Sequence, residues 1–558
     1  MLNSLFPPLK WIKGYSFKLL VHDAVSGLTL AAYAIPVSLA YATLAGLPPQ
    51  YGIYGYLIGG LIYGIFGTGM QLSVGPTSAI SLMIGTTIAG MANGDVQRWA
   101  DIASLTALLV AIISLFAYLA RLNSIVNFIS ESILLGFKAG AALTIAVTQL
   151  PKLFGLHGGG ESFFERISML VSQLPGTNIT VLSVGLSAII LLTAGERFFP
   201  GRPTAILIVV SSIILISTTS LQYSGITVVG NLPSGLPNFR IPVFSISDVD
   251  NVMPLAFACF LLAYIENVSS ARTLAQQKGY EIDSSQELLA LAATNATVAF
   301  GQGYPVSGGL SQSAVNSTAG ARTPFSLVFA SAVIAICLLF LTGLIRNLPD
   351  VVLAAVLLVA ISSLIDFSGL KRLWKVSRLE FSVAIIAFAG VIVFGILKGV
   401  IIAAIASIVL LIRAVSDPHV AFLGRIPGTK RYTDINRHPD NETIPGILLF
   451  RVEAAVLYFN VENIRKKVLA EVASHSGPLQ TIIWDLSTSP YVDIAGAKLI
   501  KKLYLEFSSQ GISLKIAEAH ADVREMLRAE EIENMFGHIS RKISIDDLVS
   551  ESTIKIPD

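Results

Sequence analysis

The segment Tyr304–Thr323 reads YPVSGGLSQSAVNSTAGART and lies deep in a very hydrophobic chain. A continuous membrane helix would avoid a proline and three glycines in one segment, whereas a helix that starts inside the membrane needs such breakers. Gly308 and Gly309 free the backbone, and Ser311 and Gln312 occupy the first turn that follows. The unpaired N–H groups and positive dipole end of such a turn form an anion site. A contact between helices through small residues, or a loop outside the membrane, explains this segment alone equally well.

A second interrupted segment, Gln71–Ser81 (QLSVGPTSAIS), favours the site inside the membrane. Gly75 and Pro76 interrupt the chain before Thr77 and Ser78 open a hydrophobic helix. Two interrupted segments in corresponding positions of two halves of a chain indicate a transporter site near the middle of the bilayer.

The composition indicates an integral membrane protein. The 558 residues are 53% hydrophobic and 13% charged, with a mean hydropathy of +0.70, whereas about 25% of the residues in a soluble chain are charged. The net charge of +2 comes with dispersed basic residues, so nucleic-acid binding is not expected. Cys259 and Cys337 lie in apolar segments, and a disulfide framework is not expected.

Hydrophobic segments near the roughly 20 residues that a bilayer requires follow one another along the chain. About fourteen spans are predicted, and the interrupted segment is the third of each half. The predicted spans are 25–44, 52–68, 73–91, 101–120, 125–149, 178–196, 203–219, 253–270, 283–302, 306–320, 325–345, 350–366, 380–396 and 399–415.

Basic residues indicate the orientation in the membrane. The N-terminal lysines, Arg121, the link with Arg197 and Arg202, and the basic cluster 371–378 fall on one side of an even-numbered topology. The positive-inside rule makes that side cytoplasmic and predicts that both termini lie in the cytoplasm of an inner (plasma) membrane protein. No cleavable signal peptide is expected.

The composition also predicts a division into parts. These are a cytoplasmic N-terminal segment at 1–23, a transmembrane domain at 24–415, a polar linker at 416–445 and a soluble α/β domain at 446–558. In the last part, strands are predicted within 446–460 and at 481–486 and 512–517, and helices at 461–474, 495–508 and 522–530. This alternation predicts a small sheet packed by helices.

Glu266, in the eighth predicted span, is the most informative single residue. A carboxylate at that depth is costly and by default marks an ion or proton path. Ser270 lies one turn further along the same face as a second oxygen ligand for Na⁺. Without a bound cation, Glu266 would instead carry a proton. The alternative is a structural carboxylate satisfied by N–H groups or by Arg272.

Two other features of the spans have weaker interpretations. Pro36 interrupts the first span, and Tyr41 could present its hydroxyl to a cavity, although a packing kink with an ordinary tyrosine explains them equally well. Glu131 and Lys138 share one face of the fifth span. We interpret them as a packing ion pair, or the lysine as extending to the membrane interface.

Several long motifs, in order, are similar to the sulfate permease (SulP) family of anion transporters over nearly the whole chain. They are IPVSLAYATLAGLPPQYGIYG at 35–55, VGPTSAIS at 74–81, GNLPSGLP at 230–237, IENVSSAR at 265–272 and SGGLSQSAVNSTAGARTP at 307–324. The segment YVDIAGAKLIKKL at 491–503 resembles the family's cytoplasmic STAS domain.

This resemblance implies an all-α membrane transporter with a seven-plus-seven inverted repeat, divided into a core and a gate subdomain. The anion would bind between the N-termini of half-helices 3 and 10, and the protein would form a homodimer in the lipid bilayer. The substrate-facing turns implied by the resemblance contain Ser73, Gly75, Thr77, Ser78, Gly309, Leu310, Ser311 and Gln312. Tyr41 matches an aromatic contact of the first helix, and Glu266 and Ser270 match the position of a coupling ion.

The chain departs from the family pattern at several positions. Val37 stands where the family often has glutamine, and neutral Gln312 stands where some animal relatives have arginine. Glutamate instead of aspartate at 266 favours proton coupling over Na⁺. In the STAS-like part, Asp493 is followed by Ile494 and Ala495, so the hydroxyl that related regulators phosphorylate is absent.

We therefore expect secondary active transport of a small oxyanion, by alternating access and symport with a cation or proton. Sulfate is favoured, with bicarbonate or a dicarboxylate as alternatives, and Na⁺ or H⁺ would be the only ion required besides the substrate. An uncoupled anion channel or facilitator, an anion exchanger, a membrane-anchored regulator and a nucleobase permease are the alternative functions. An enzyme is not expected, since the sequence contains no nucleophile–base constellation, phosphate-binding loop or metal-ligand cluster.

Overall fold

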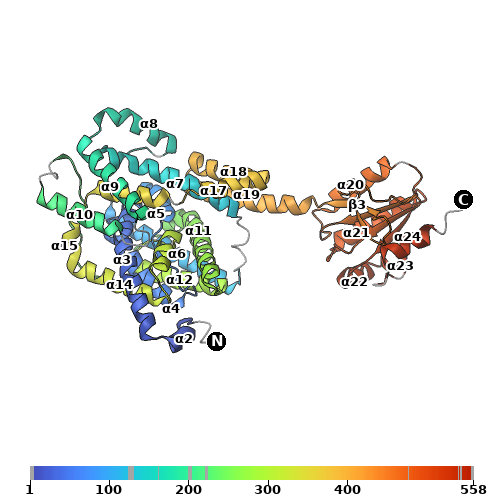
Figure 1. Ribbon diagram of the computed structural model, residues 1–558, viewed down its shortest axis with the longest axis horizontal. Coiled ribbons are helices and arrows are strands. Elements are labelled where there is room, and N and C mark those ends of the chain that lie inside the picture. The colour runs from blue at the N-terminus through green and yellow to red at the C-terminus, as the bar shows by residue number, and fades with distance from the viewer. Residues whose placement is uncertain are drawn as a thin grey trace. The chain divides into compact units, whose positions relative to one another are not determined.

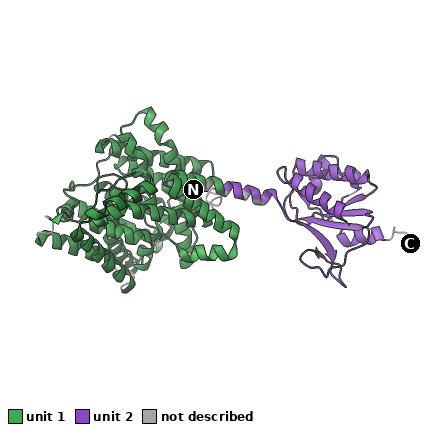
Figure 2. Ribbon diagram, turned by 90° about the horizontal axis from the view of Figure 1, so that it is seen from above, with its two compact units in different colours: residues 1–407 green, residues 408–558 purple. Residues whose placement is uncertain are grey.

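The computed structural model divides into two compact units, residues 1–407 and 408–558, which Figure 2 colours separately. The structure describes residues 6–92, 94–122, 131–160, 162–198, 204–219, 224–362, 364–475, 477–537, 539–540 and 543–553. Arg202, part of the orientation argument, and the side chain of Glu131 lie outside this description.

The first unit is a helical bundle around one apolar core (Figure 1). Its first-half helices are α2 (Pro8–Trp11), α3 (Phe17–Leu44), α4 (Gln50–Phe66), α5 (Ser78–Ala92), α6 (Val96–Leu119), α7 (Glu131–Phe154), α8 (Phe163–Gln173), α9 (Ile179–Phe198) and α10 (Thr204–Thr218). The second half contains α11 (Ile246–Lys278), α12 (Ser284–Phe300), α13 (Leu310–Thr318), α14 (Phe325–Ile336), α15 (Thr342–Ile345), α16 (Asp350–Ser362), α17 (Phe367–Val376), α18 (Arg378–Phe394) and the first part of α19 (Ile396–Ser416), which continues into the second unit.

Each predicted span contains a helix, which confirms the mostly helical membrane fold, although the number of spans stays approximate. Six described helices are long and apolar enough to cross a membrane singly by length and composition, or seven if one bent helix pair counts as a span. The others are shorter or interrupted. One of the six, Phe325–Ile345, joins α14 and α15 through a five-residue π-helical segment, Cys337–Leu341. Two short amphipathic helices, α8 and α17, were not predicted.

The first membrane helix begins earlier than the sequence indicated. Residues 17–23, assigned to the N-terminal segment, belong to α3, and the Ser16 hydroxyl caps this helix by accepting a hydrogen bond from the Leu19 N–H. The fully buried Asp23 accepts hydrogen bonds from the Arg322 and Thr323 N–H groups. The start of α3 is therefore tied to the segment that follows α13.

The second unit is built on a five-stranded sheet in the order β4-β3-β5-β6-β7. Pairing is antiparallel from β4 to β5 and parallel from β5 to β7. The strands are β3 (Val420–Arg425), β4 (Tyr432–Asp434), β5 (Ile447–Val452), β6 (Thr481–Asp485) and β7 (Ser513–Ala517); the helices are α20 (Val461–Ser474), α21 (Ile494–Ser508), α22 (Ala521–Ala529), α23 (Glu533–Phe536) and α24 (Ile545–Thr553). The predicted alternation of strands and helices after residue 446 is present.

The prediction of a linker at 416–445 is wrong, because this segment contains β3 and β4, two of the five strands of the sheet. Proline and glycine pairs in this segment suggested a linker, but Val420, Ala421 and Leu423 are buried against β5 and the adjoining core. The polar residues lie mainly in the turns around β4. The soluble domain therefore begins near Val420.

Candidate functional site

The two interrupted segments meet in space through a very short antiparallel pairing. Strand β1 (Val74–Gly75) precedes α5, strand β2 (Ser307–Gly308) precedes α13, and Val74 pairs with Gly308 while Gly75 pairs with Ser307. Each strand leads within a few residues into a helix, so this pairing brings the starts of both half-helices together. The structure thereby unites two segments more than 200 residues apart in sequence.

Glycine is required on both strands for this close approach. A Cβ atom on Gly75 would collide with the ring of Tyr56, and one on Gly308 would lie 2.6 Å from Asn267 Oδ1. The Gly-Pro and Gly-Gly pairs that marked the sequence therefore serve backbone packing as well as helix interruption.

Side chains strengthen the connection between the two half-helices. The Ser73 N–H donates to Ser313 Oγ at 2.8 Å, and Gln312 Nε2 donates to the Pro76 carbonyl at 2.7 Å. The Ser73 hydroxyl forms a 2.5 Å hydrogen bond with Tyr56. The Ser73 hydroxyl and the Gln312 amide nitrogen, both predicted to face substrate, are thus engaged within the protein.

Other polar groups at this junction have unused hydrogen-bonding capacity. Thr77 Oγ1 and Gln312 Oε1 are buried and have no hydrogen-bond partner among the described residues. The first-turn N–H groups of α5 and α13 have no partner within their own helices, as at any helix start. Two aligned helix starts place partial positive charge at one point. The helix starts and the Thr77 hydroxyl can therefore attract an anion, whereas the Gln312 oxygen can only accept a hydrogen bond.

The remaining predicted residues lie around the same junction. Tyr41, in α3, is buried, interacts with the Ser78 side chain and lies within electrostatic reach of Glu266. Gly309 and Ser311 are half-buried, and Leu310 is 46% exposed at the start of α13. The structure therefore gathers the predicted residues of the first, third and tenth spans around one point.

Glu266 reaches this junction from the middle of α11. Its Oε2 atom accepts a 2.7 Å hydrogen bond from the Ser307 hydroxyl, on strand β2. Ser270 is buried one turn further along α11, while Arg272, the alternative partner, donates to Ser284 Oγ at 2.9 Å. Glu266 is half-buried.

The groups beside Glu266 suit a singly charged ion. The described residues include no cluster of three or more histidine, cysteine, aspartate or glutamate side chains that could hold a metal. Hydroxyl groups surround the carboxylate instead: Ser307 bonds to it, and Thr77 lies beside it. One carboxylate with hydroxyl and carbonyl oxygens is chemically suited to Na⁺, or to a proton.

A second buried carboxylate, Glu287 in α12, was missed in the sequence. It is fully buried and accepts hydrogen bonds from the Tyr63 hydroxyl at 3.1 Å, the Thr68 N–H at 2.8 Å, the Thr68 hydroxyl at 2.5 Å and Asn267 Nδ2 at 2.5 Å. These donors satisfy both oxygens and tie α4, α11 and α12 together. Glu287 lies only three residues after the helix start, which disguised it as an ordinary first-turn acid.

Lys138 was interpreted as a packing or interfacial lysine, but its charge acts on Glu266 and on Asp366. It is half-buried in α7. The sequence did show a lysine within a hydrophobic span. Its proximity to Glu266 could not be predicted, because that depends on tertiary structure. Lys138 therefore lies within electrostatic reach of Glu266.

Comparisons with known proteins agree with this geometry. The model of the sulfate permease family matches residues 20–387, and that of the STAS domain matches residues 438–544. A Mycobacterium tuberculosis protein described as a probable sulfate transporter is 32% identical over 95% of this chain and 93% of its own length. Sulfate transporter 4.1, chloroplastic, of Arabidopsis thaliana is 29% identical over 94% of this chain and 78% of its own.

Solved structures share the fold. The murine Solute Carrier 26 family member A9 anion transporter in the inward-facing state has a TM-score of 0.90 at 22% identity, covering 99% of this chain and 94% of that chain. The transmembrane domain of the cyanobacterial bicarbonate transporter BicA has a TM-score of 0.61 at 20% identity, covering 71% and 98%. The relatives support anion transport as the general activity. With its paired half-helices and its STAS domain, the chain belongs to the sulfate permease family.

Proposed function

We propose that the protein is a secondary active transporter of a small oxyanion, with sulfate as the first candidate, and that Glu266 binds the coupling cation or proton. The observation that carries this proposal is the junction of the α5 and α13 starts, with the Glu266 carboxylate hydrogen-bonded to strand β2, which leads into α13. The sulfate transporters among the relatives support the choice of anion.

The half-helix starts would stabilise the anion through backbone N–H groups and helix dipoles. Thr77 and the Ser78–Tyr41 pair would supply hydroxyl groups. A tetrahedral oxyanion has four oxygens and can accept several such donors at once. This arrangement binds charge without a cationic side chain in direct contact, while Lys138 contributes from a distance.

Coupling would follow from the position of Glu266. An ionised carboxylate near the bound anion repels it, because charges interact strongly where water is excluded. A Na⁺ ion bound by Glu266 and Ser270, or a proton on Glu266, removes that repulsion. Anion and coupling ion would then bind cooperatively and cross together while the core moves against the gate.

We further propose that the protein functions as a homodimer in the inner (plasma) membrane, with both termini in the cytoplasm. The positive-inside distribution supports the orientation. The family resemblance supports the dimer.

The proposal is tested with purified protein in liposomes. Labelled sulfate, bicarbonate and fumarate are offered separately, each with an inward Na⁺ gradient, an inward proton gradient or neither. Wild type is compared with Glu266→Gln and with Glu281→Gln, a control at an exposed glutamate in the segment between α11 and α12. We expect sulfate accumulation driven by one of the gradients, lost in Glu266→Gln and kept in Glu281→Gln.

Other outcomes distinguish the alternatives. Equal flux under all gradients, unchanged in Glu266→Gln, would contradict the coupling role and indicate a channel or facilitator. Uptake that requires an anion inside the liposome would indicate exchange. Accumulation of bicarbonate or fumarate without sulfate would correct the substrate.

A further inference from the structure

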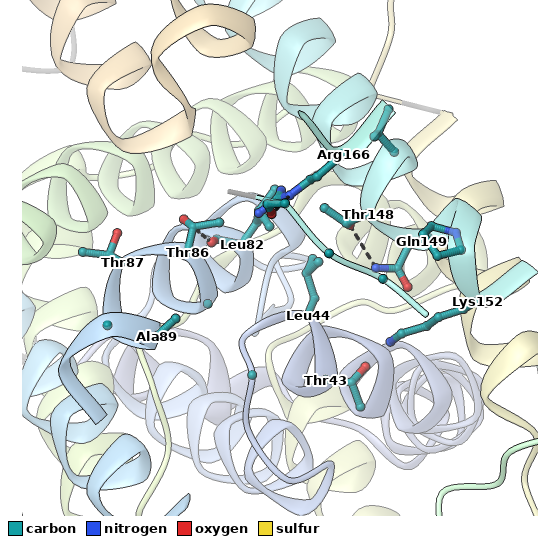
Figure 3. Close-up of a pocket in the computed structure, with 18 residues that line it drawn as sticks. Thr43, Leu44, Leu82, Thr86, Thr87, Ala89, Thr148, Gln149, Lys152 and Arg166 are labelled. Atoms are coloured by element: carbon teal, nitrogen blue, oxygen red, sulfur yellow. Dashed lines mark hydrogen bonds between the residues drawn. The ribbon is translucent and has the colours of Figure 1, made fainter. Parts of the chain in front are cut away.

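A pocket of about 560 Å³ lies beyond the half-helix junction, between the C-terminal end of α3, the later turns of α5 and the α7–α8 segment (Figure 3). Its lining starts at Leu82, one helical turn after Ser78, and extends to Gly90. The pocket therefore lies at the C-terminal ends of α3 and α5, whereas the junction lies at the start of α5.

Two positively charged side chains enter this pocket from different helices. Lys152 comes from the last turn of α7 and Arg166 from the first turn of α8, and both point into the cavity in Figure 3. Its described lining contains no aspartate or glutamate. The pocket is therefore positively charged, unlike the junction, where backbone N–H groups predominate.

The neutral polar groups of the lining do not compensate this charge. The hydroxyls of Thr43, Thr86 and Thr148 donate to carbonyl groups of their own helices, and Gln149 Nε2 donates to Thr148 Oγ1 at 3.1 Å. These groups are already engaged. Lys152 and Arg166 are the charged groups of the lining, and the Thr87 hydroxyl is a neutral donor in the same lining.

Local contacts hold Arg166 in place. Arg166 Nε donates to the Gly160 carbonyl at 2.9 Å, and the capping box of Ser162 and Glu165 fixes the start of α8. Acidic groups act on the pair only through space: Asp350 on Lys152 and Glu165 on Arg166. Neither cation forms an ion pair with a carboxylate among the described residues. Two cations facing one cavity repel each other, and an anion bound between them relieves that repulsion.

From this arrangement we propose that Lys152 and Arg166 form a capture site for the transported oxyanion, separate from the half-helix junction. The inference rests on the proposed function, because it assumes that the ligand is the transported anion. Its preferred ligand is a divalent oxyanion, since each cation can compensate one negative charge. The site raises the anion concentration next to the junction, an effect that added salt screens.

The first test measures the kinetics of sulfate uptake into liposomes from the side of the membrane that this pocket faces. The variants are Lys152→Gln, Arg166→Gln and the double variant. Arg346→Gln is the control, because this exposed arginine lies in the segment before α16 and does not line the pocket. We expect the double variant to raise KM about tenfold at low ionic strength with kcat unchanged, and the difference to shrink at high salt.

A second test restores the charge chemically in folded protein. Arg166→Cys is treated with a cationic or an anionic methanethiosulfonate reagent, and the native Cys259 and Cys337 are both buried. The cationic reagent is expected to return KM towards the wild-type value, and the anionic reagent to raise it further. Wild type treated in the same way controls for the native thiols.

The outcomes separate this inference from the proposed function. If wild type transports sulfate while all variants keep its KM at low salt, the capture site is wrong and the transport function stands. If both reagents change Arg166→Cys equally, the effect is steric and the electrostatic role is likewise overturned. If wild type transports no oxyanion, the proposed function fails, and the capture site fails with it.

Discussion

The Ser307 hydroxyl donates a 2.7 Å hydrogen bond to the Glu266 carboxylate. Ser307 belongs to strand β2, which pairs with Gly75 of β1 and leads into α13. The ionisable group of α11 is therefore bonded directly to the element that sets the position of both half-helices. Occupation of Glu266 by the proposed coupling ion can thus alter the proposed anion site through one contact.

Replacing Ser307 with alanine tests this contact. A hydrogen bond to a charged group contributes about 1.5–3 kcal/mol, so the half-saturating concentration of the coupling ion should change about tenfold or more. If that ion is Na⁺, its half-saturating concentration rises, because an oxygen close to the carboxylate is lost. If it is a proton, uptake extends to higher pH, because the ionised carboxylate loses a donor. The measurement is the dependence of uptake on the concentration of the coupling ion, with Ser317→Ala in α13 as control. If Ser307→Ala leaves this dependence unchanged, the hydrogen bond between Ser307 and Glu266 has no part in binding the coupling ion.

Glu287→Gln should primarily lower stability. The carboxylate accepts hydrogen bonds from Tyr63, Thr68 and Asn267 in the core, and an amide would direct its own N–H groups at these donors. Leaving a buried network mismatched costs about 3 kcal/mol. Thermal unfolding in detergent should show a lower midpoint than Glu281→Gln, while the folded fraction keeps its ion coupling. A stable but uncoupled variant would instead assign Glu287 to the transport path.

Gly308→Ala should abolish transport through packing. The added Cβ would lie 2.6 Å from Asn267 Oδ1 and 2.8 Å from a Leu72 methyl group, so β2 would have to move away from α11. Overpacking of this kind costs about 1–3 kcal/mol. Gly343→Ala is a matched control, because a Cβ there meets no atom within 4 Å. Uptake and thermal unfolding are measured for both; normal uptake by Gly308→Ala would show that the two strands are not held together during transport.

In the second unit, Asp434 should support stability above acidic pH. Burial opposes its ionisation, but hydrogen bonds from His419 and the Asn436 N–H, and the charges of His419 and Arg437, outweigh burial and hold the pKa of Asp434 below its usual value. Because the pKa of Asp434 is lower in the folded state than in the unfolded state, its ionised carboxylate stabilises the folded domain at pH values above the unfolded-state pKa of about 3.9. This stabilisation is lost as the pH falls through the folded-state pKa.

The test is urea unfolding of residues 408–558, monitored by Trp484, the one tryptophan in that segment. Asp434→Asn should cost about 1 kcal/mol at pH 7, since His419 is partly exposed. Wild type and variant should converge as the pH falls below about 4. A constant difference across this range would contradict an electrostatic origin.

The sequence predicted the membrane helices because hydrophobic length is a local property. The interrupted segments were equally visible, since proline and glycine pairs are rare within spans. The partners of these segments depend on tertiary contacts. Examples are the Tyr56–Ser73 hydrogen bond and the bond from Gln312 to the Pro76 carbonyl. No periodicity in the sequence shows which hydroxyl groups form hydrogen bonds within the protein and which remain able to bind a ligand.

Charged residues show the same limit. Glu266 was identified because it lies in the middle of a long apolar span, whereas Glu287 follows a polar helix start and resembled an ordinary cap residue. The β3 and β4 strands were hidden by turns rich in proline and glycine, although the residues between those turns are buried. Local composition predicts an element reliably only when the element is long compared with its turns.

The antiparallel pairing of β1 and β2 also has an electrical consequence. The chain runs in opposite directions in the two strands, and each continues into its own half-helix. Where α5 and α13 continue the opposite directions of their strands, their positive ends meet at the junction while their dipoles cancel over the pair. A membrane voltage would therefore act mainly on the charges that are carried. One divalent anion with two monovalent cations would cross without current, and any other ratio would make uptake depend on membrane potential.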